Sequence, residues 1–367
     1  MYSGVFKRMA AGLLAVGMIL LAPGASTLAR ADQGSGGASC QGAEVSVPVA
    51  LLLSSTMHGT LCLPSGGQAS TVMVLIPGAT YNQAYWNFPY EPQIYNFRQA
   101  MNRANYATFV VDRMGTGESS KPLSALLTAD LQAAAVHAVI QELRDGEIGG
   151  HRFNKVIVGG HSLGSAISIL EAANYHDVDG VFLSGFSHKL NLVTIAKLFL
   201  SFQPAPLDPD LDDPGLDVGY LTTKPGTRGE DFYYKATENP KVVDTDEATK
   251  DVWSTLEAPD SLGFSVVLSV THLIKVPVLI ANGGADNSIC TGAGSGNCAS
   301  AAAFRAQETP FFSPASCLQT YLLADSGHDV NLATDTPDYQ KAAKSWADRF
   351  VGSGSGRISP PRGACSS

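Results

Sequence analysis

The stretch KVIVGGHSLG, residues 155–164, decides the fold. Its first half is a short apolar run of the kind that forms a strand buried on both faces, and residues 163–175 read as a helix. Between them, GHSLG matches G-x-S-x-G, in which a serine occupies a tight turn from strand to helix. The flanking Gly160 and Gly164 let neighbouring elements approach without side-chain clashes. We therefore predict that Ser162 is a nucleophile exposed at this turn.

The same alternation of apolar runs and helical patterns extends along the chain on both sides of the turn. The expected strands are residues 71–76, 107–111, 155–158, 181–183, 278–281 and 318–323, and the expected helices are residues 94–105, 124–144, 163–175, 299–307 and 338–350. An edge hairpin is expected within residues 44–63. Such alternation predicts an α/β fold with a mostly parallel, doubly wound sheet.

One segment interrupts this rhythm. Residues 186–271 separate two neighbouring strands, and a structureless loop of that length would be implausible in a compact domain. We interpret it as an inserted, mainly helical cap. The core then comprises residues 32–185 and 272–351, and residues 352–367 form a flexible, low-complexity tail.

A serine hydroxyl needs a base to take its proton, and the base needs an orienting acid. His328 follows the last apolar strand, and Asp286 follows the strand VLIA, so both are expected at the carboxyl edge of the sheet. The chain order Ser, Asp, His is the order of a known catalytic arrangement. Asp325 and Asp329 remain rival acids because of their closeness to His328 in sequence.

Two backbone N–H groups should stabilise the negative charge that develops on the substrate oxygen. One is expected from Leu163, directly after the nucleophile. The other is expected from the loop after TVMVLI, where Ala79 is the first choice and Thr80 the alternative.

Together these features resemble the α/β-hydrolase family over residues 45–350. The resemblance is carried by Pro77-Gly78, the loop DRMGTGES at residues 112–119, GHSLG, Asp286 and His328. The DRMGTGES loop is similar to a family loop of mainly structural role, so Asp112 is not expected to be catalytic. Many members have His-Gly in place of Pro77-Gly78, and dehalogenases and epoxide hydrolases of this fold have Asp in place of Ser162. The resemblance therefore implies a serine hydrolase.

Two groups of apolar residues are candidates for the substrate pocket. Tyr81 and Trp86 belong to an aromatic cluster after residue 80, which either packs the loop or forms a wall of the acyl pocket. Leu198 and Phe199 lie in a helical pattern within the cap that is apolar around much of its circumference. That pattern favours a core helix over a helix that covers the site. If one face does look onto Ser162, the substrate is apolar near its scissile bond.

The N-terminus predicts the compartment. Lys7 and Arg8 precede an uncharged run, and Ala29-Arg30-Ala31 offers a small-x-small cleavage site. This order is typical of a secretory signal peptide over residues 1–31, with an uncleaved anchor as the alternative. We therefore expect a secreted protein, extracellular or periplasmic, without a stable membrane span.

Removal of residues 1–31 leaves 24 − 3 = 21 basic against 33 acidic residues, a net charge of 21 − 33 = −12. So acidic a chain has little electrostatic reason to bind nucleic acid. Six cysteines in an exported chain favour disulfides and allow fifteen full sets of pairs. Closeness along the chain favours Cys40–Cys62 and Cys290–Cys298, which leaves Cys317–Cys365 as the third pair. Without a paired C-x-x-C or an H-E-x-x-H motif, neither a metal nor a cofactor is expected.

The sequence thus predicts a hydrolase acting on a small or lipid-like carboxylic ester through an acyl-enzyme on Ser162. Acyl transfer or lactone chemistry on the same residues is one alternative. A binding module that retains the fold without catalysis is another.

Overall fold

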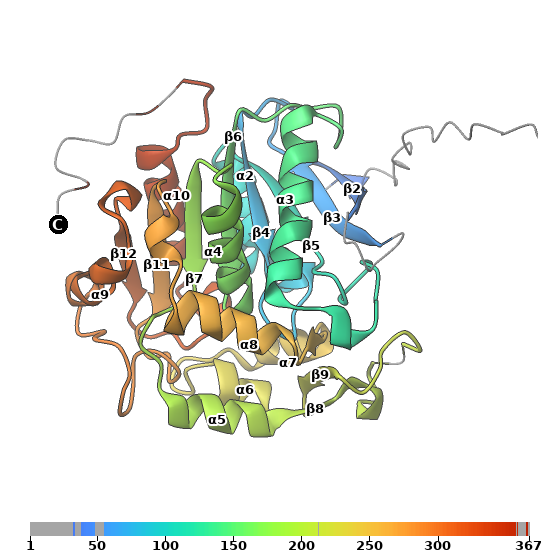
Figure 1. Ribbon diagram of the computed structural model, residues 1–367, viewed down its shortest axis with the longest axis vertical. Coiled ribbons are helices and arrows are strands. Elements are labelled where there is room, and N and C mark those ends of the chain that lie inside the picture. Colours follow the sequence, from blue (N-terminus) through green and yellow to red (C-terminus); the bar gives the residue numbers. More distant parts are fainter. Residues whose placement is uncertain are drawn as a thin grey trace, which may run out of the picture.

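A nine-stranded sheet runs through the centre of the protein (Figure 1), with the strand order β1-β2-β3-β5-β4-β6-β7-β11-β12. The computed structural model describes residues 32–33, 38–47, 55–211, 213–356, 358 and 365. The signal peptide predicted over residues 1–31 lies outside the described residues, as does most of the predicted tail.

The strands divide into a parallel part and an antiparallel edge. Strands β5, β4, β6, β7, β11 and β12 are parallel, whereas β3, β2 and β1 extend the sheet in antiparallel fashion. Their bounds are β1 Asp32–Gln33, β2 Ser39–Ser46, β3 Thr56–Leu63, β4 Thr71–Ile76, β5 Ala107–Val111, β6 Lys155–His161, β7 Gly180–Ser184, β11 Val278–Gly283 and β12 Gln319–Leu323. Every residue of β4 and β6 is buried, as expected for central parallel strands.

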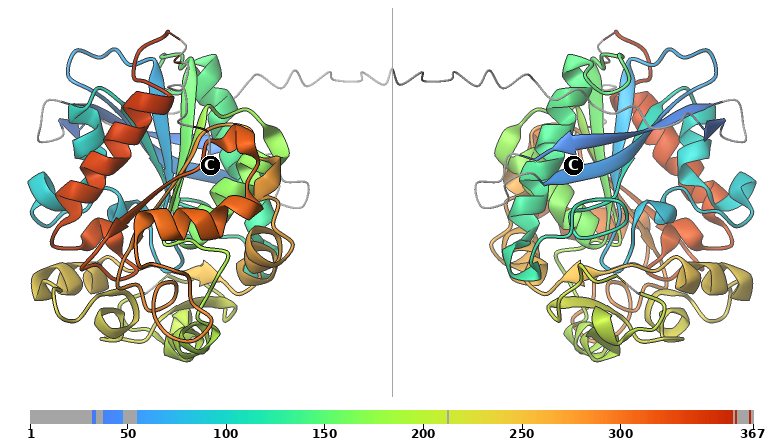
Figure 2. Two further views of the ribbon diagram at one scale, coloured as in Figure 1. Left: turned by 90° about the vertical axis from the view of Figure 1, so that its left-hand side faces the viewer. Right: turned by 90° about the vertical axis from the view of Figure 1, so that its right-hand side faces the viewer.

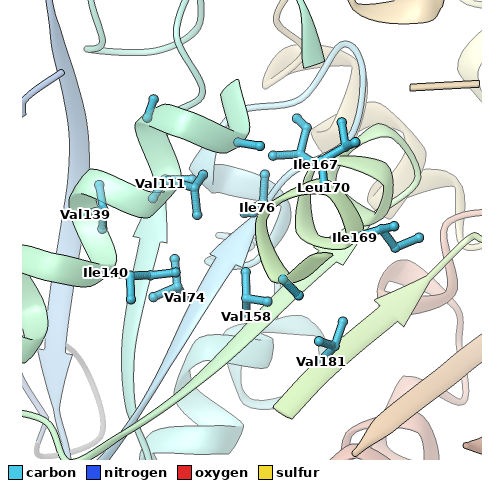
Figure 3. Close-up of a cluster of buried hydrophobic side chains, with 14 of the residues drawn as sticks. Val74, Ile76, Val111, Val139, Ile140, Val158, Ile167, Ile169, Leu170 and Val181 are labelled. Carbon is cyan, nitrogen blue, oxygen red and sulfur yellow. The ribbon is translucent and has the colours of Figure 1, made fainter. Parts of the chain in front are cut away.

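Helices cover both faces of the sheet, which the side views show edge-on (Figure 2). Helices α3 and α4 lie on one face, and α1, α2 and α10 lie on the other. Their bounds are α1 Pro92–Tyr95, α2 Phe97–Arg103, α3 Ala129–Asp145, α4 Leu163–Tyr175 and α10 Thr336–Phe350, with α9 Ala301–Glu308 beside β12. Figure 3 shows the core under α3 and α4, where Val139 and Ile167 pack over Val74 and Val158. The predicted doubly wound α/β fold is confirmed.

The segment between β7 and β11, called the cap below after the interpretation of its sequence, lies beyond one end of the sheet (Figure 1). Its helices are α5 Leu192–Ser201, α6 Arg228–Phe232, α7 Pro240–Ala248, α8 Glu257–Leu262 and the π-helix η4 Gly263–Val267. It also contains a small antiparallel sheet of β8 Phe202–Pro204, β9 Tyr220–Thr223 and β10 Trp253–Ser254. The sequence did not predict this sheet, because strands of two to four residues carry too little pattern.

Short 3-10 helices complete the described elements: η1 Gln83–Tyr85, η2 Ser124–Leu126, η3 Ala205–Leu207, η5 Thr271–Leu273, η6 Thr309–Phe311, η7 Pro314–Ser316 and η8 Val330–Leu332. The structure joins the cysteines as Cys40–Cys62, Cys290–Cys298 and Cys317–Cys365, the three pairs expected from the sequence. Within the described ranges, no helix combines the length and hydrophobicity that crossing a membrane requires.

Candidate active site

Ser162 occupies the turn between β6 and α4. Its backbone has φ 52° and ψ −117°, a conformation that costs energy for a residue with a side chain and that is concentrated at functional sites. The turn needs its two glycines, because a Cβ on Gly160 would collide with the carbonyl of Gly164, and one on Gly164 with the carbonyl of Ile76. The side chain of Ser162 does not cap the helix that it precedes, so its hydroxyl is available for chemistry.

His328 and Asp286 come together at the same edge of the sheet. Nδ1 of His328 lies 2.8 Å from Oδ2 of Asp286, and the Asp286 side chain is fully buried. Gly185 makes room for the imidazole, since a Cβ there would lie 2.9 Å from Cε1 of His328. Asp286 also accepts hydrogen bonds from the N–H of Ser288 at 2.8 Å and from its hydroxyl at 2.6 Å. The imidazole is thus held through Nδ1, which leaves Nε2 as the nitrogen that can exchange a proton.

Asp286 and His328 each stabilise the charged form of the other. Burial alone would raise the pKa of Asp286, but the charge of His328 and the hydrogen bonds from His328 and Ser288 leave it lowered. Burial alone would lower the pKa of His328, but the charge and hydrogen bond of Asp286 raise it above 6.5. An ionised carboxylate beside an imidazole stabilises the imidazolium that forms when a serine gives up its proton.

Two backbone amides are available for an oxyanion. Ala79 and Leu163 both line the cavity that holds Ser162 and His328. Neither N–H donates a hydrogen bond to any described residue. Thr80, the alternative to Ala79, is fully buried and does not line this cavity. Its hydroxyl accepts from Arg228 at 3.0 Å, and its carbonyl accepts from the N–H of Asp251 at 2.9 Å.

A cavity of about 390 Å³ opens above Ser162. The sheet edge contributes Ser162, Leu163, Ala79, Gly185 and His328, and the segment between β7 and β11 contributes most of the apolar walls. Those walls include Ile195, Leu198, Phe199, Phe202, Phe232, Trp253, Leu262 and Val266. An apolar cavity around one group of polar residues is typical of a small-molecule site.

The apolar helix predicted within the cap corresponds to α5. The sequence pattern favoured a helix buried in the core, and the structure places α5 elsewhere. No residue of α5 is buried, and Leu192 and Leu200 are 72% and 74% exposed. Leu198 and Phe199 nevertheless face the cavity. The interpretation of this pattern as a core helix was therefore wrong, because α5 lies between the cavity and solvent and has apolar residues on both sides.

Tyr81 and Trp86, candidates for the substrate pocket in the sequence, are buried and do not line the cavity. Trp86 is fully buried and packs against Phe97. Tyr81 is buried as well, and its hydroxyl contacts the carboxylate of Asp329. The sequence could not show which side of the loop the aromatic cluster would face.

Asp329, a rival acid in the sequence, belongs to a buried polar network that the sequence did not reveal. Its Oδ1 lies 3.0 Å from Nε2 of His161, and burial raises its pKa to about 6 against the opposing charges of Arg228 and His328. Arg228 binds both oxygens of Asp246 at 2.9 Å, and the Tyr81 hydroxyl lies 3.3 Å from Asp246. No motif predicts this network, because its members come from the core and from the cap. It joins α6 and α7 to the loop that carries His328.

The chain matches the alpha/beta hydrolase family over residues 73–339, a span that exceeds half of its length and includes Ser162, Asp286 and His328. It therefore belongs to the alpha/beta hydrolase family.

Individual proteins resemble parts of the chain or its fold. Lipase 1 of Psychrobacter immobilis is 37% identical over 87 residues, which are 23% of this chain and only a quarter of that protein's length. An esterase of Thermogutta terrifontis has a TM-score of 0.50 at 16% identity and covers 83% of this chain and 97% of its own. Carboxylesterase CesB of Bacillus subtilis has a TM-score of 0.53 at 16% identity, covering 84% and 91%. The alpha/beta hydrolase GrgF of Penicillium sp. sh18 has a TM-score of 0.54 at 14% identity. The match covers 85% of this chain and 99% of GrgF. At these identities the structures show the shared fold.

Proposed function

We propose that this chain is a secreted serine hydrolase that cleaves carboxylic esters through an acyl-enzyme on Ser162. The observation that carries the proposal is the strained turn at Ser162, which opens into the same apolar cavity as an imidazole oriented by a buried carboxylate. The similarity of an 87-residue segment to a lipase and the esterase-like fold support the same chemistry.

In the proposed first step, Oγ of Ser162 attacks the ester carbonyl carbon while Nε2 of His328 takes the hydroxyl proton. The carbonyl electron pair moves to oxygen, where the N–H groups of Ala79 and Leu163 stabilise it. The tetrahedral intermediate collapses, the carbon–oxygen bond to the alcohol breaks, and His328 returns the proton to the departing oxygen. Asp286 stabilises the charged imidazole throughout.

In the second step, water attacks the acyl-enzyme and gives its proton to His328. Collapse of the second intermediate releases the carboxylic acid and returns the proton to Oγ of Ser162. The walls of the cavity are mainly apolar, so the acyl or alcohol part that occupies it is expected to be apolar.

A fluorophosphonate probe and a series of p-nitrophenyl esters test this proposal. The wild type should be labelled once per chain and should hydrolyse the esters. Ser162→Ala should lose labelling and on the order of 10⁶ in turnover, as when a nucleophile is removed from a triad. The control is Ser345→Ala, an exposed serine on α10, which should behave as the wild type. Residual turnover of Ser162→Ala within tenfold of the wild type would reject the assignment.

Two further measurements address the remaining parts of the proposal. Product analysis with added alcohols separates hydrolysis from acyl transfer, because transfer would yield new esters in place of the free acid. N-terminal sequencing of protein from the periplasm and the culture medium checks export. A chain that begins at Asp32 is the expected result, and a retained Met1 would contradict it.

A further inference from the structure

A second cluster of ionisable side chains lies between α3 and α4, which run side by side on one face of the sheet (Figure 1). His137 belongs to α3, Glu171 belongs to α4, and Asp177 lies in the turn from α4 to β7. Nδ1 of His137 is 2.9 Å from Oδ2 of Asp177 and 3.9 Å from Oε1 of Glu171. One ligand atom from each of the three residues fits within 4.8 Å of the others. The cluster has no part in the proposed ester hydrolysis.

Polar atoms of this cluster lack the partners that burial demands. The Glu171 side chain is fully buried, and neither of its oxygens has a hydrogen-bond partner among the described residues. Nδ1 of His137 and Oδ1 of Asp177 are buried and unpartnered by the same measure. The imidazole nitrogen is close to Asp177, but the direction of approach is wrong for a hydrogen bond. Buried polar atoms are almost always paired, so a concentration of unpaired ones points to a ligand-binding site.

The guanidinium of the neighbouring Arg144 does not pair with the Glu171 carboxyl. Arg144 donates to the backbone carbonyl of Asp177 at 2.6 Å and to the carboxylate of Asp179 at 2.7 Å, so its guanidinium is occupied elsewhere. Among the described residues, neither oxygen of the buried Glu171 carboxyl is therefore paired with Arg144.

We propose that His137, Glu171 and Asp177 bind a divalent transition-metal ion such as zinc. Zinc bonds to nitrogen and oxygen are about 2.0–2.2 Å long, which places tetrahedral ligand atoms about 3.4 Å apart. The observed separations of 2.9 and 3.9 Å fall on either side of that value. An imidazole with two carboxylates suits zinc better than calcium or magnesium, which prefer oxygen ligands.

The surroundings of the cluster favour a preformed site. The ring of Tyr175 stacks on His137 with 3.8 Å between centroids and 7° between planes, which fixes the orientation of the imidazole. The amide of Gln141 donates to Asp177, an outer contact of the kind that orients a ligating carboxylate. His137 is 30% exposed, so an ion can enter from solvent.

The role of such an ion is structural. It would join the middle of α3 to the last turn of α4 and to the turn that follows it. Glu171 lies nine residues after Ser162, about 13 Å along the helix axis at 1.5 Å per residue, so the ion would not reach the ester. A ligand that binds only the folded state raises thermal stability, so the expected sign is a higher Tm with unchanged ester chemistry.

The test uses full-length protein stripped with a chelator and then titrated with zinc. Calorimetry and elemental analysis after dialysis should give one zinc per chain, and the Tm should rise by several degrees. Cobalt(II) in place of zinc should give a visible absorption band that reports nitrogen and oxygen coordination. The variants are Glu171→Gln, which keeps the shape and removes the charge, and His137→Gln at the partly exposed edge. Each should weaken zinc affinity at least tenfold and abolish the rise in Tm.

His272→Gln is the matched control, because it removes an exposed imidazole far from the cluster in sequence. It should bind zinc as the wild type does. The proposal is overturned if the wild type binds no stoichiometric zinc, or if Glu171→Gln and His137→Gln bind it unchanged. Equal stabilisation by calcium would overturn the assignment to a transition metal. If Glu171→Gln does not fold, His137→Gln and Asp177→Asn decide the question by the same measurements.

Discussion

Nη2 of Arg113 donates a hydrogen bond to the carbonyl oxygen of Gly78 at 3.1 Å. The carbonyl and the N–H of a trans peptide point in opposite directions, so a bond that fixes the oxygen of Gly78 also fixes the N–H of Ala79. The same guanidinium binds Glu257 of α8 at 2.6 Å and the carbonyl of Val252 at 3.1 Å. Arg113 therefore connects the orientation of the proposed oxyanion amide to the position of the cap.

This relationship predicts the effect of Arg113→Lys. A lysine keeps the charge but cannot reach Gly78, Val252 and Glu257 together, because it lacks the planar fork of arginine. We expect kcat to fall by roughly 10- to 100-fold with a smaller change in KM, less than the 10²–10³ that follows loss of an oxyanion donor.

The control for this variant is Arg228→Lys, another fully buried arginine paired with a cap carboxylate. Arg228 binds the side chain of Thr80 and no carbonyl of the Gly78–Ala79 peptide, so its loss should lower the Tm without an equal loss in kcat. If both variants lose turnover in proportion to their loss of Tm, Arg113 has only a structural role.

The acid assignment predicts unequal effects of three substitutions. Asp286→Asn should lower turnover by roughly 10⁴, the cost of an imidazole held in the wrong tautomer. Asp329→Asn should cost far less, because Asp329 faces His161 and Tyr81. Asp325→Asn should have little effect, since Asp325 is exposed. Steady-state kinetics at the pH optimum decide the matter, and a larger loss for Asp329→Asn than for Asp286→Asn would show that the acid has been misassigned.

The pH dependence of kcat/KM follows from the state of His328. The imidazole must be neutral to take the serine proton, so activity should be lost as pH falls through its pKa. That pKa is raised above 6.5 by Asp286 and, less strongly, by Asp329. Asp329→Asn removes a negative charge that favours the imidazolium, so the acid limb should move to lower pH. A pH profile of both proteins measures the shift, and movement to higher pH contradicts the electrostatic account.

Sequence patterns predicted the features that depend on neighbouring residues in the chain, and missed those that depend on contacts between distant segments. The turn at Ser162 and the positions of Asp286 and His328 depend on local strand-end patterns, and the structure brings His328 and Asp286 together as the chain order suggested. The side toward which Tyr81 faces depends on tertiary packing that no local pattern encodes. The cluster of His137, Glu171 and Asp177 escaped spacing rules because its ligands come from two helices and a turn.

The last prediction concerns the cap, which forms most of the cavity wall. Phe199 lines the cavity, packs against Phe202 and Trp253, and is 44% exposed, so a polar residue there would change the wall without emptying a core. Each methylene buried in the site is worth about 0.8 kcal/mol, a factor of about four in kcat/KM. Phe199→Gln should therefore shift the chain-length optimum toward shorter esters, and Leu198→Gln should act in the same direction.

Leu200→Gln provides the matched control. Leu200 lies on the same helix, is 74% exposed and does not line the cavity. We therefore expect no contact between Leu200 and the substrate. Its length profile should equal that of the wild type, and fluorophosphonate labelling of Ser162 should persist in all three variants. An unchanged profile for Phe199→Gln and Leu198→Gln, with lower Tm and uniformly lower activity, would mean that these side chains only hold the cap together. The selectivity of the enzyme would then have to come from other parts of the cavity.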